Sequence, residues 1–255
     1  GLGMNVKAIS LNVGKALLVS ALFMLISIGV SLLEGRDAAF TPLLISFIIV
    51  LLVGAFPFIF VRKTQALSLN DGFLTIVLSW LLSFIFGMLP YVLYGGEFTL
   101  INAWFESVSG FTTTGASILN DIEFLPRGLL FWRSATAWIG GMGVVMFALV
   151  VLPSMGKSRH MLSNVELSTI AKDNFHYRSK VIIRILILVY VSLTVVTALL
   201  LKYEGMSWYD AINHAMTACG TCGFSTKNDS IAHFDSVNIE MIIMGAMVIS
   251  GIHFG

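Results

Sequence analysis

Charged side chains are scarce in this sequence. Asp, Glu, Lys and Arg make up 11% of its 255 residues, whereas about a quarter of a typical soluble domain is charged. The net charge is only +1, so no strongly basic surface is indicated and no nucleic-acid partner is expected. Two cysteines exclude a disulfide framework. The serines near histidines fall in loops without a third catalytic partner, so we do not expect an enzyme.

Apolar residues are abundant instead, at 57% of the chain, and the mean hydropathy is +0.90. They occur in long blocks, and a helix of about 20 residues crosses a hydrocarbon core of about 30 Å. The sequence therefore predicts an all-α integral membrane protein. The first block is expected to be a retained helix because no small-residue cleavage site follows it. The predicted spans are 15–33, 40–61, 73–94, 128–152, 181–201 and 237–254.

The distribution of Lys and Arg predicts the orientation, because these residues are enriched on the cytoplasmic side. Placing the N-terminus inside leaves only Arg36, Arg127, Lys202 and Lys227 in outer loops, while most acidic residues then lie at the outer face. We therefore predict a multi-pass protein of the cytoplasmic (inner) cell membrane with its N-terminus inside. The basic residues placed inside are Lys7, Lys15, Arg62, Lys63, Lys157, Arg159, Lys172, Arg178, Lys180 and Arg184.

Two outer stretches, 99–111 and 207–219, have helical character but are too short to span a membrane. Thr99 and Ser207 are suitable N-cap residues, and Asp210 completes a capping-box pattern after Ser207. Each stretch runs into a segment rich in Thr and Gly. The sequence therefore predicts two short helices that each end in a glycine-containing turn.

These two regions align without a gap as an internal repeat. Each copy lies between a preceding and a following span, so the order span, short helix, glycine turn, span occurs twice. The aligned pairs are Ala103 with Ala211, Thr113 with Thr221, Gly115 with Gly223, and Ser117 with Ser225.

Segments of this composition suit a dehydrated cation, which needs oxygen atoms around it. Backbone carbonyls supply them when the chain is extended and directs them inward. The required backbone angles alternate between the ordinary and the left-handed regions, and glycine adopts the left-handed region easily. This explains why glycine occurs at Gly115 and Gly223. The partially negative C-terminal end of each short helix also favours a cation. A surface re-entrant loop of small residues is the alternative, which two copies in register disfavour.

The run 111–117, Phe-Thr-Thr-Thr-Gly-Ala-Ser, resembles the first filter of the Trk/Ktr/HKT superfamily of potassium transporters. In the next span, 131–134 (Phe-Trp-Arg-Ser) and 138–143 (Trp-Ile-Gly-Gly-Met-Gly) also resemble this superfamily, and 223–226 (Gly-Phe-Ser-Thr) resembles its second filter. The resemblance covers essentially the whole chain from Met4. The two leading spans make it most similar to the Trk-type potassium uptake subunit.

The family fold has four helix–pore-loop–helix units around one pore, so the resemblance implies that this chain is an N-terminal half. The implied parts are a leading transmembrane helix pair (1–70), a first unit (71–156), a cytoplasmic linker (157–178) and a second unit (179–255). The implied potassium filter residues are Thr112, Thr113, Thr114, Gly115, Ala116, Gly220, Thr221, Cys222, Gly223 and Phe224. Both aligned glycines match the potassium pattern, whereas Cys219, Gly220 and Cys222 depart from the family's usual second filter.

The resemblance further implies potassium uptake, with potassium as the transported substrate and no covalently bound cofactor. The implied partners are a second copy in a homodimer, a cytoplasmic nucleotide-binding regulatory subunit and the lipid bilayer. One alternative is a sodium-selective or poorly selective cation transporter of the same fold. Another is a non-conducting membrane half-protein or scaffold.

Arg133 lies inside a predicted span, where an unpaired charge is costly. We predict that it pairs with Glu106, the only acid in the first short helix, and that the pair supports the pore through a bidentate contact. Asp210 and Asp121 are the other candidate partners. Snorkelling of Arg133 towards the outer surface is the alternative.

Three further features each have two interpretations. The glycines of 140–143 indicate helix packing in preference to a hinge. Cys219 and Cys222 form a C-x-x-C pattern, but zinc normally takes four ligands and only His214 and His233 are near. We therefore expect small pore-wall residues there, and no metal except potassium at the filter. The stretch 161–177 is interpreted as a solvated or interfacial helix in preference to a docking site for a regulatory ring.

Overall fold

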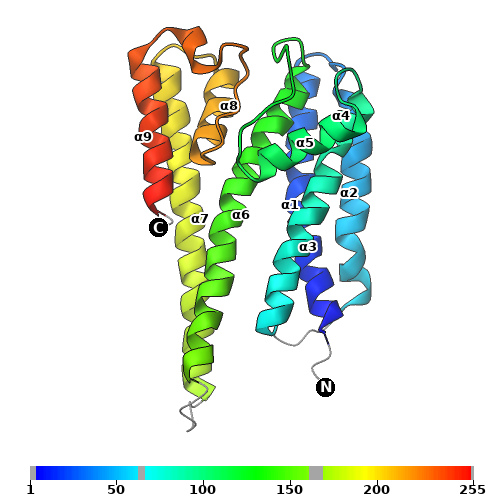
Figure 1. Cartoon of the computed structure of the whole chain (residues 1–255), viewed down its shortest axis with the longest axis vertical. Helices are drawn as coiled ribbons and strands as arrows, with labels where there is room; N and C mark the ends of the chain where they lie inside the picture. The colour runs from blue at the N-terminus through cyan, green and yellow to red at the C-terminus, as the bar shows by residue number, and fades with distance from the viewer. Residues whose placement is uncertain (1–3, 63–66, 161–168, 254–255) are drawn as a thin grey trace.

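The computed structural model describes residues 4–62, 67–160 and 169–253, and that part of the chain is helical, with no strand (Figure 1). Two 12-residue helices fall on the stretches for which the sequence predicts short helices. The elements in order are α1 (Val6–Leu33), α2 (Phe40–Phe60), α3 (Leu69–Gly87), α4 (Leu89–Tyr94), α5 (Leu100–Phe111), α6 (Arg127–His160), α7 (Thr169–Tyr203), α8 (Trp208–Cys219), the 3₁₀ helix η1 (Ser230–Phe234) and α9 (Val237–His253).

Four helical segments of the described chain are long and apolar enough to cross a membrane, and α9 is a shorter apolar helix. The four segments are Val6–Leu33, Phe40–Phe60, Asn70–Tyr94 and Val181–Tyr203. The predicted spans 128–152 and 237–254 fall on α6 and α9, with 254 outside the described residues. The chain is therefore an all-helical protein with several candidate spans.

The first helix is longer than predicted. The span expected at 15–33 begins at Val6, and the side chain of Asn5 caps it by accepting the N–H of Ala8 at 3.2 Å. Lys15, at the start of the predicted span, is exposed on the helix surface, while Ile9 on the preceding turns is buried. One charge on the outward face does not end a helix whose inward face stays apolar.

The third predicted span, 73–94, is broken into α3 and α4 at Met88. Pro90 lies in the first turn of α4, where its missing N–H costs nothing, but the same ring would clash inside a continuous helix. The break allows α4 to change direction before the chain enters α5 (Figure 1).

The helices α1 and α2 pack closely because glycines face each other. A β-carbon added to Gly14 would lie 2.6 Å from the carbonyl oxygen of Gly54. Small residues permit this close approach, and such packing holds helices together in a membrane, where the hydrophobic effect does not drive their association. The helix α1 also packs against α3 and α6.

The helices α6 and α7 are long neighbours that extend beyond the α1–α3 bundle at the lower end of the molecule (Figure 1). The predicted linker, 157–178, includes the end of α6 and the beginning of α7, and 161–168 lie outside the described residues. The prediction of an interfacial helix or docking site over 161–177 thus falls partly outside the described residues.

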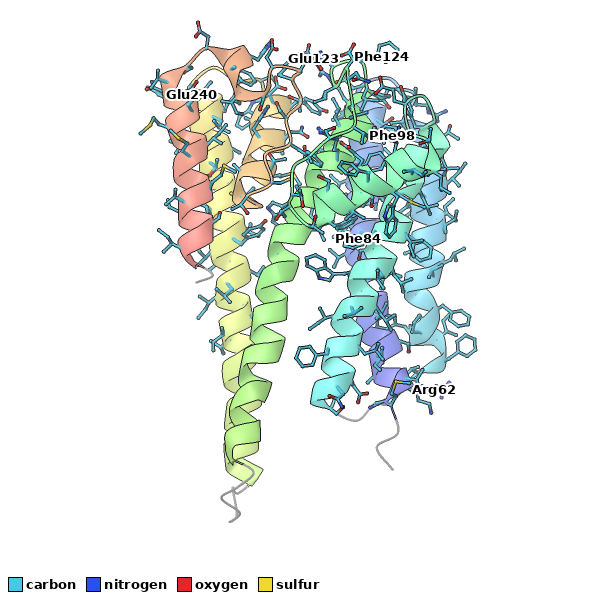
Figure 2. All side chains as sticks on the ribbon, in the orientation of Figure 1. Arg62, Phe84, Phe98, Glu123, Phe124 and Glu240 are labelled. Carbon is cyan, nitrogen blue, oxygen red and sulfur yellow. The ribbon has the colours of Figure 1, made fainter. Side chains whose placement is uncertain are left out.

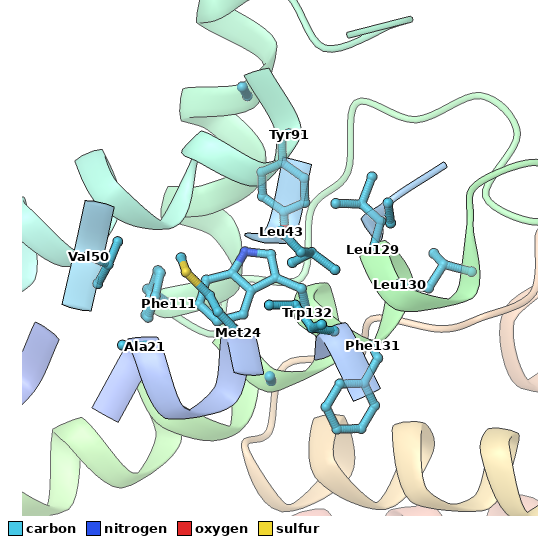
Figure 3. Packing of buried hydrophobic residues seen from close by; sticks show 14 of the residues in the cluster. Ala21, Met24, Leu43, Val50, Tyr91, Phe111, Leu129, Leu130, Phe131 and Trp132 are labelled. Atoms are coloured by element: carbon cyan, nitrogen blue, oxygen red, sulfur yellow. The ribbon is translucent and has the colours of Figure 1, made fainter. Parts of the chain in front are cut away.

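The main apolar core surrounds Trp132 of α6, which is fully buried where α6 packs on α1 and α5 (Figure 3). Its indole Nε1 donates to the carbonyl oxygen of Gly87 at 3.0 Å, so the polar edge of the ring is satisfied. Its ring packs edge-on against Phe111, the last residue of α5. This core therefore determines where α5 ends, and the segment that follows α5 starts from a rigid point.

Two acidic residues and one basic residue lie at opposite ends of the molecule. Glu123 and Glu240 lie at the end where α4 and η1 are found, whereas Arg62 lies at the opposite end (Figure 2). This separation agrees with the charge asymmetry on which the orientation prediction rests.

Candidate functional site

The two short helices begin at the residues that the sequence indicated. The side chain of Thr99 caps α5 by accepting the N–H of Asn102 at 3.2 Å. The side chain of Ser207 caps α8 by accepting the N–H of Asp210 at 3.0 Å. The predicted stretches 99–111 and 207–219 are confirmed as capped helices of equal length.

The segments after these helices, which we name the first loop (112–120) and the second loop (220–229), start with the same backbone conformation. Thr113 and Thr221 have φ of 56° and 55°, and Gly115 and Gly223 have φ of 78° and 94°. The intervening residues are not left-handed. Alternation of this kind turns successive carbonyls towards one side of the chain, so the repeat exists in the backbone as well as in the sequence.

Matching hydrogen bonds anchor both loops to their helices. The N–H of Thr114 donates to the carbonyl of Ser109 at 2.9 Å, and the N–H of Cys222 donates to the carbonyl of Thr217 at 3.0 Å. These bonds satisfy carbonyls that the helix ends would otherwise leave open. Each loop is thus hydrogen-bonded to the last turns of its helix.

The two loops touch each other. A β-carbon added to Gly115 would lie 2.0 Å from the carbonyl oxygen of Cys222 and 3.8 Å from its Sγ atom. No side chain fits at Gly115 without movement of the second loop. The repeated segments, far apart in the sequence, therefore form one continuous surface.

The predicted filter residues differ in exposure. All five in the first loop are partly or fully exposed, whereas the second loop alternates, with Thr221 and Gly223 exposed and Gly220, Cys222 and Phe224 buried. The carbonyl of Ala116 accepts a hydrogen bond from the Ser109 hydroxyl at 2.5 Å. That oxygen therefore holds the first loop onto α5.

Arg133 joins the two loops from within α6. Its side chain is 3% exposed and its Nε donates to Glu106 Oε1 at 2.6 Å, where Glu106 is fully buried in α5. Its Nη1 donates to the carbonyl of Ser225 at 3.0 Å, and its guanidinium lies 3.8 Å from the centre of the Phe224 ring. The predicted pairing with Glu106 is confirmed.

The predicted bidentate contact is wrong in one respect. Glu106 Oε2 accepts the N–H of Ile118 at 3.1 Å, and the second hydrogen bond of the guanidinium goes to the Ser225 carbonyl. The other proposed partners are engaged elsewhere, because Asp210 accepts from Thr226 and Asp121 accepts from Asn228. One buried cation thus binds a carboxylate of α5 and a carbonyl of the second loop.

Two adjacent glycines let α6 pass between the ends of the short helices. A β-carbon on Gly140 would lie 2.0 Å from the carbonyl oxygen of Phe111, and one on Gly141 would lie 2.7 Å from the Cα of Gly220. The packing interpretation of this glycine cluster is supported for both residues. Gly143 has nothing within 4 Å of such a position.

Sequence reasoning missed two further connections. Asn228 Oδ1 accepts the N–H of Ile122 at 2.6 Å and its Nδ2 donates to Asp121 at 3.0 Å, which ties the second loop to the segment after the first. His214 Nε2 lies 2.8 Å from Ser225 Oγ. The repeat alignment contained a signal for His214, because it places this residue on Glu106.

Neither cysteine belongs to a metal site in the part of the chain that the structure describes. Both thiols are free and buried, and the described residues contain no group of three or more His, Cys, Asp or Glu placed to hold a metal ion. Cys222 instead lies against the first loop.

Comparisons with known proteins agree with this architecture. The family described as TrkH, cation transport protein, matches residues 41–255. The Trk system potassium uptake protein TrkH of Escherichia coli (strain K12) is 36% identical over 257 residues, which cover 99% of this chain and 53% of that protein. The protein of the same name from Halomonas elongata is 34% identical, over 98% of this chain and 52% of that protein.

A solved structure is also similar. The crystal structure of the potassium transporter TrkH from Vibrio parahaemolyticus superposes with a TM-score of 0.82 at 31% identity, over 96% of this chain and 50% of that one. This chain therefore spans about half the length of the relatives that it matches.

Proposed function

Because the chain belongs to the TrkH family of cation transport proteins, we propose that it forms the N-terminal half of a potassium uptake protein. It contributes two of four helix–pore-loop–helix units around one pore. The units are 71–156 and 179–255, preceded by a transmembrane helix pair (1–70) and separated by a cytoplasmic linker (157–178). The relatives are transport proteins, in keeping with the prediction that the chain is not an enzyme.

The observation that carries this proposal is the contact between the two loops. Two segments with the same alternating backbone meet at Gly115 and Cys222. A potassium ion sheds its water where carbonyls of these loops replace the hydration shell. The membrane potential drives uptake with about 2.3 kcal/mol per charge per 100 mV.

The remaining parts of the proposal concern assembly. The chain works with a second copy and with a cytoplasmic nucleotide-binding regulator, and it lies in the cytoplasmic membrane with its N-terminus inside. Support for the orientation comes from Arg62 at one end of the molecule and Glu123 and Glu240 at the other (Figure 2).

Transport by the complete natural protein tests the function directly. Proteoliposomes that contain it are expected to take up rubidium, a potassium substitute, in preference to sodium under an inside-negative potential. Equal rubidium and sodium uptake would favour the poorly selective alternative. No uptake of either ion would favour the non-conducting scaffold.

Replacing Gly115 with serine is expected to lower the rubidium-over-sodium ratio by about tenfold, equivalent to about 1.4 kcal/mol. The new β-carbon would lie 2.0 Å from the Cys222 carbonyl oxygen at a φ of 78°, so the loops must separate. Ion flux in proteoliposomes measures the ratio.

The matched control is Gly95→Ser. Gly95 has a similar φ of 83° but no atom within 4 Å of an added β-carbon, so it reports backbone strain alone. An unchanged ratio in Gly115→Ser, or an equal loss in Gly95→Ser, would remove Gly115 from the filter.

The orientation has its own test. Asp229→Cys in the second loop is expected to react with a membrane-impermeant maleimide on intact cells, while Met4→Cys reacts only after permeabilisation, because both positions are exposed and the proposed topology puts them on opposite faces of the membrane. Mass-spectrometric mapping of each labelled peptide gives the readout. The reverse pattern would invert the topology.

A further inference from the structure

Glu106 and His214 occupy the same place in the repeat, under the alignment that pairs Gly115 with Gly223. Each side chain reaches forward to the hydroxyl of the serine two residues after its glycine. Ser117 Oγ donates to Glu106 Oε1 at 2.8 Å, and Ser225 Oγ lies 2.8 Å from His214 Nε2. Glu106 and His214 are 0% and 1% exposed. Two different side chains thus perform the same contact.

The proton positions on His214 follow from its partners. Its Nδ1 lies 2.7 Å from the carbonyl oxygen of Asp210, which can only accept. Nδ1 therefore carries a hydrogen and donates. Burial lowers the pKa of His214, which favours the neutral ring, so Nε2 is an acceptor for the Ser225 hydroxyl. The Ser225 oxygen in turn accepts the N–H of Lys227 at 3.1 Å.

The charge balance around the loops explains why the second residue is neutral. Arg133 donates to the carboxylate of Glu106 and to the carbonyl of Ser225. This one buried guanidinium offsets one buried carboxylate. A second carboxylate at position 214 would have no such partner, and an uncompensated buried charge is strongly destabilising. A neutral acceptor at 214 makes the serine contact without that cost.

We propose that His214 is a positioning residue for the cation path, which holds Ser225 so that its carbonyl meets Arg133 and the second loop stays against the first. In the first unit Glu106 performs this task with a charge, and in the second His214 performs it without one. The effect on ion selectivity rests on the proposed function, but the effect on the loop does not.

Cys222 provides a natural reporter, because its buried thiol lies in the second loop against Gly115. The experiment compares His214→Leu, which removes the acceptor, with His214→Gln, whose amide oxygen can still accept from Ser225. The complete natural protein is treated in membranes with methyl methanethiosulfonate. Modification of Cys222 is followed with time by peptide mass spectrometry. His233→Leu is the matched control, since His233 is exposed on η1.

Cys222 in His214→Leu is expected to react about fivefold to tenfold faster than in the wild type, the factor that corresponds to loss of one hydrogen bond. His214→Gln and His233→Leu are expected to react at the wild-type rate. Ser225→Ala, a smaller change, removes the same bond together with the Lys227 contact, so it is expected to react at least as fast as His214→Leu, and the double variant is expected to react no faster than Ser225→Ala alone. If His214→Leu does not fold, Ser225→Ala and His214→Gln give the same comparison.

Rubidium and sodium fluxes of the same proteins separate the two proposals. Both proposals are supported if the wild type transports, Ser225→Ala has a lower rubidium-over-sodium ratio, and His214→Gln keeps the wild-type ratio. The role of His214 is overturned, whatever the fluxes are, if Cys222 is modified at the wild-type rate in both His214→Leu and Ser225→Ala. Where His214→Leu does not fold, a wild-type rate in Ser225→Ala is enough to overturn it. A wild-type protein without flux overturns the proposed function, while the labelling rates still decide on His214.

Discussion

Replacing Arg133 with alanine is expected to abolish transport and to destabilise the fold by about 3–5 kcal/mol, the cost of breaking a buried ion pair. The change leaves the buried Glu106 carboxylate without its cation and the Ser225 carbonyl without its donor. Lysine is expected to be a poor substitute, because its ammonium lacks the planar fork that contacts Glu106 and Ser225 while stacking on Phe224. Thermal unfolding in detergent and rubidium flux measure the two effects.

The chain offers a matched control for this prediction. Arg127 pairs with Glu34 at 2.8 Å, but the two side chains are 55% and 38% exposed. Arg127→Ala is therefore expected to cost no more than about 1 kcal/mol. Adding Glu106→Gln to Arg133→Ala is expected to recover part of the stability, since it removes the orphaned charge. Similar losses of stability in the Arg127 and Arg133 variants would show that the buried ion pair stabilises the fold no more than the exposed one.

Replacing Gly140 with alanine is expected to reduce transport by at least about tenfold, with about 1–3 kcal/mol of destabilisation typical of overpacking. The added β-carbon would lie 2.0 Å from the carbonyl oxygen of Phe111. That oxygen belongs to the backbone at the end of α5 and cannot rotate away. The first loop must then shift relative to α6, and rubidium flux together with thermal unfolding measures the result.

Gly143→Ala is the control for that change, because it lies on the same helix with nothing within 4 Å of an added β-carbon. Alanine is the better helix former, so this variant is expected to be neutral or slightly stabilising. Equal defects at 140 and 143 would indicate that flexibility of the helix matters, and the hinge interpretation would replace the packing one.

Much of the helical architecture was predictable because it depends on local properties of the chain. Long apolar blocks form helices in a membrane since every backbone polar group must be satisfied internally. Thr99 and Ser207 mark the short helices through their own hydroxyls. The family resemblance, based on the runs around Gly115 and Gly223, is confirmed by the match over 41–255.

The candidate spans Val6–Leu33 and Asn70–Tyr94 contain the predicted spans 15–33 and 73–94, but the helix bounds within them also depend on neighbouring elements. The predicted span began at Lys15, whereas the helix α1 begins at Val6, where packing on other helices stabilises the additional turns. The predicted span 73–94 contains a break at Met88, which Pro90 indicates only once its place in the first turn of α4 is known. A charge or a proline has different effects according to the face or turn it occupies.

The sequence by itself determined the membrane class, the two capped helices and the repeat, and it indicated that Arg133 needs a partner, with Glu106 the favoured one. Each follows from hydropathy, residue type or the high cost of an unpaired buried charge. The tertiary structure alone decided that Arg133 also binds the Ser225 carbonyl, that Gly140 and Gly141 face the ends of α5 and α8, and that His214 holds Ser225. These contacts join residues far apart in the chain or depend on side-chain direction, and one sequence specifies neither until the helices pack.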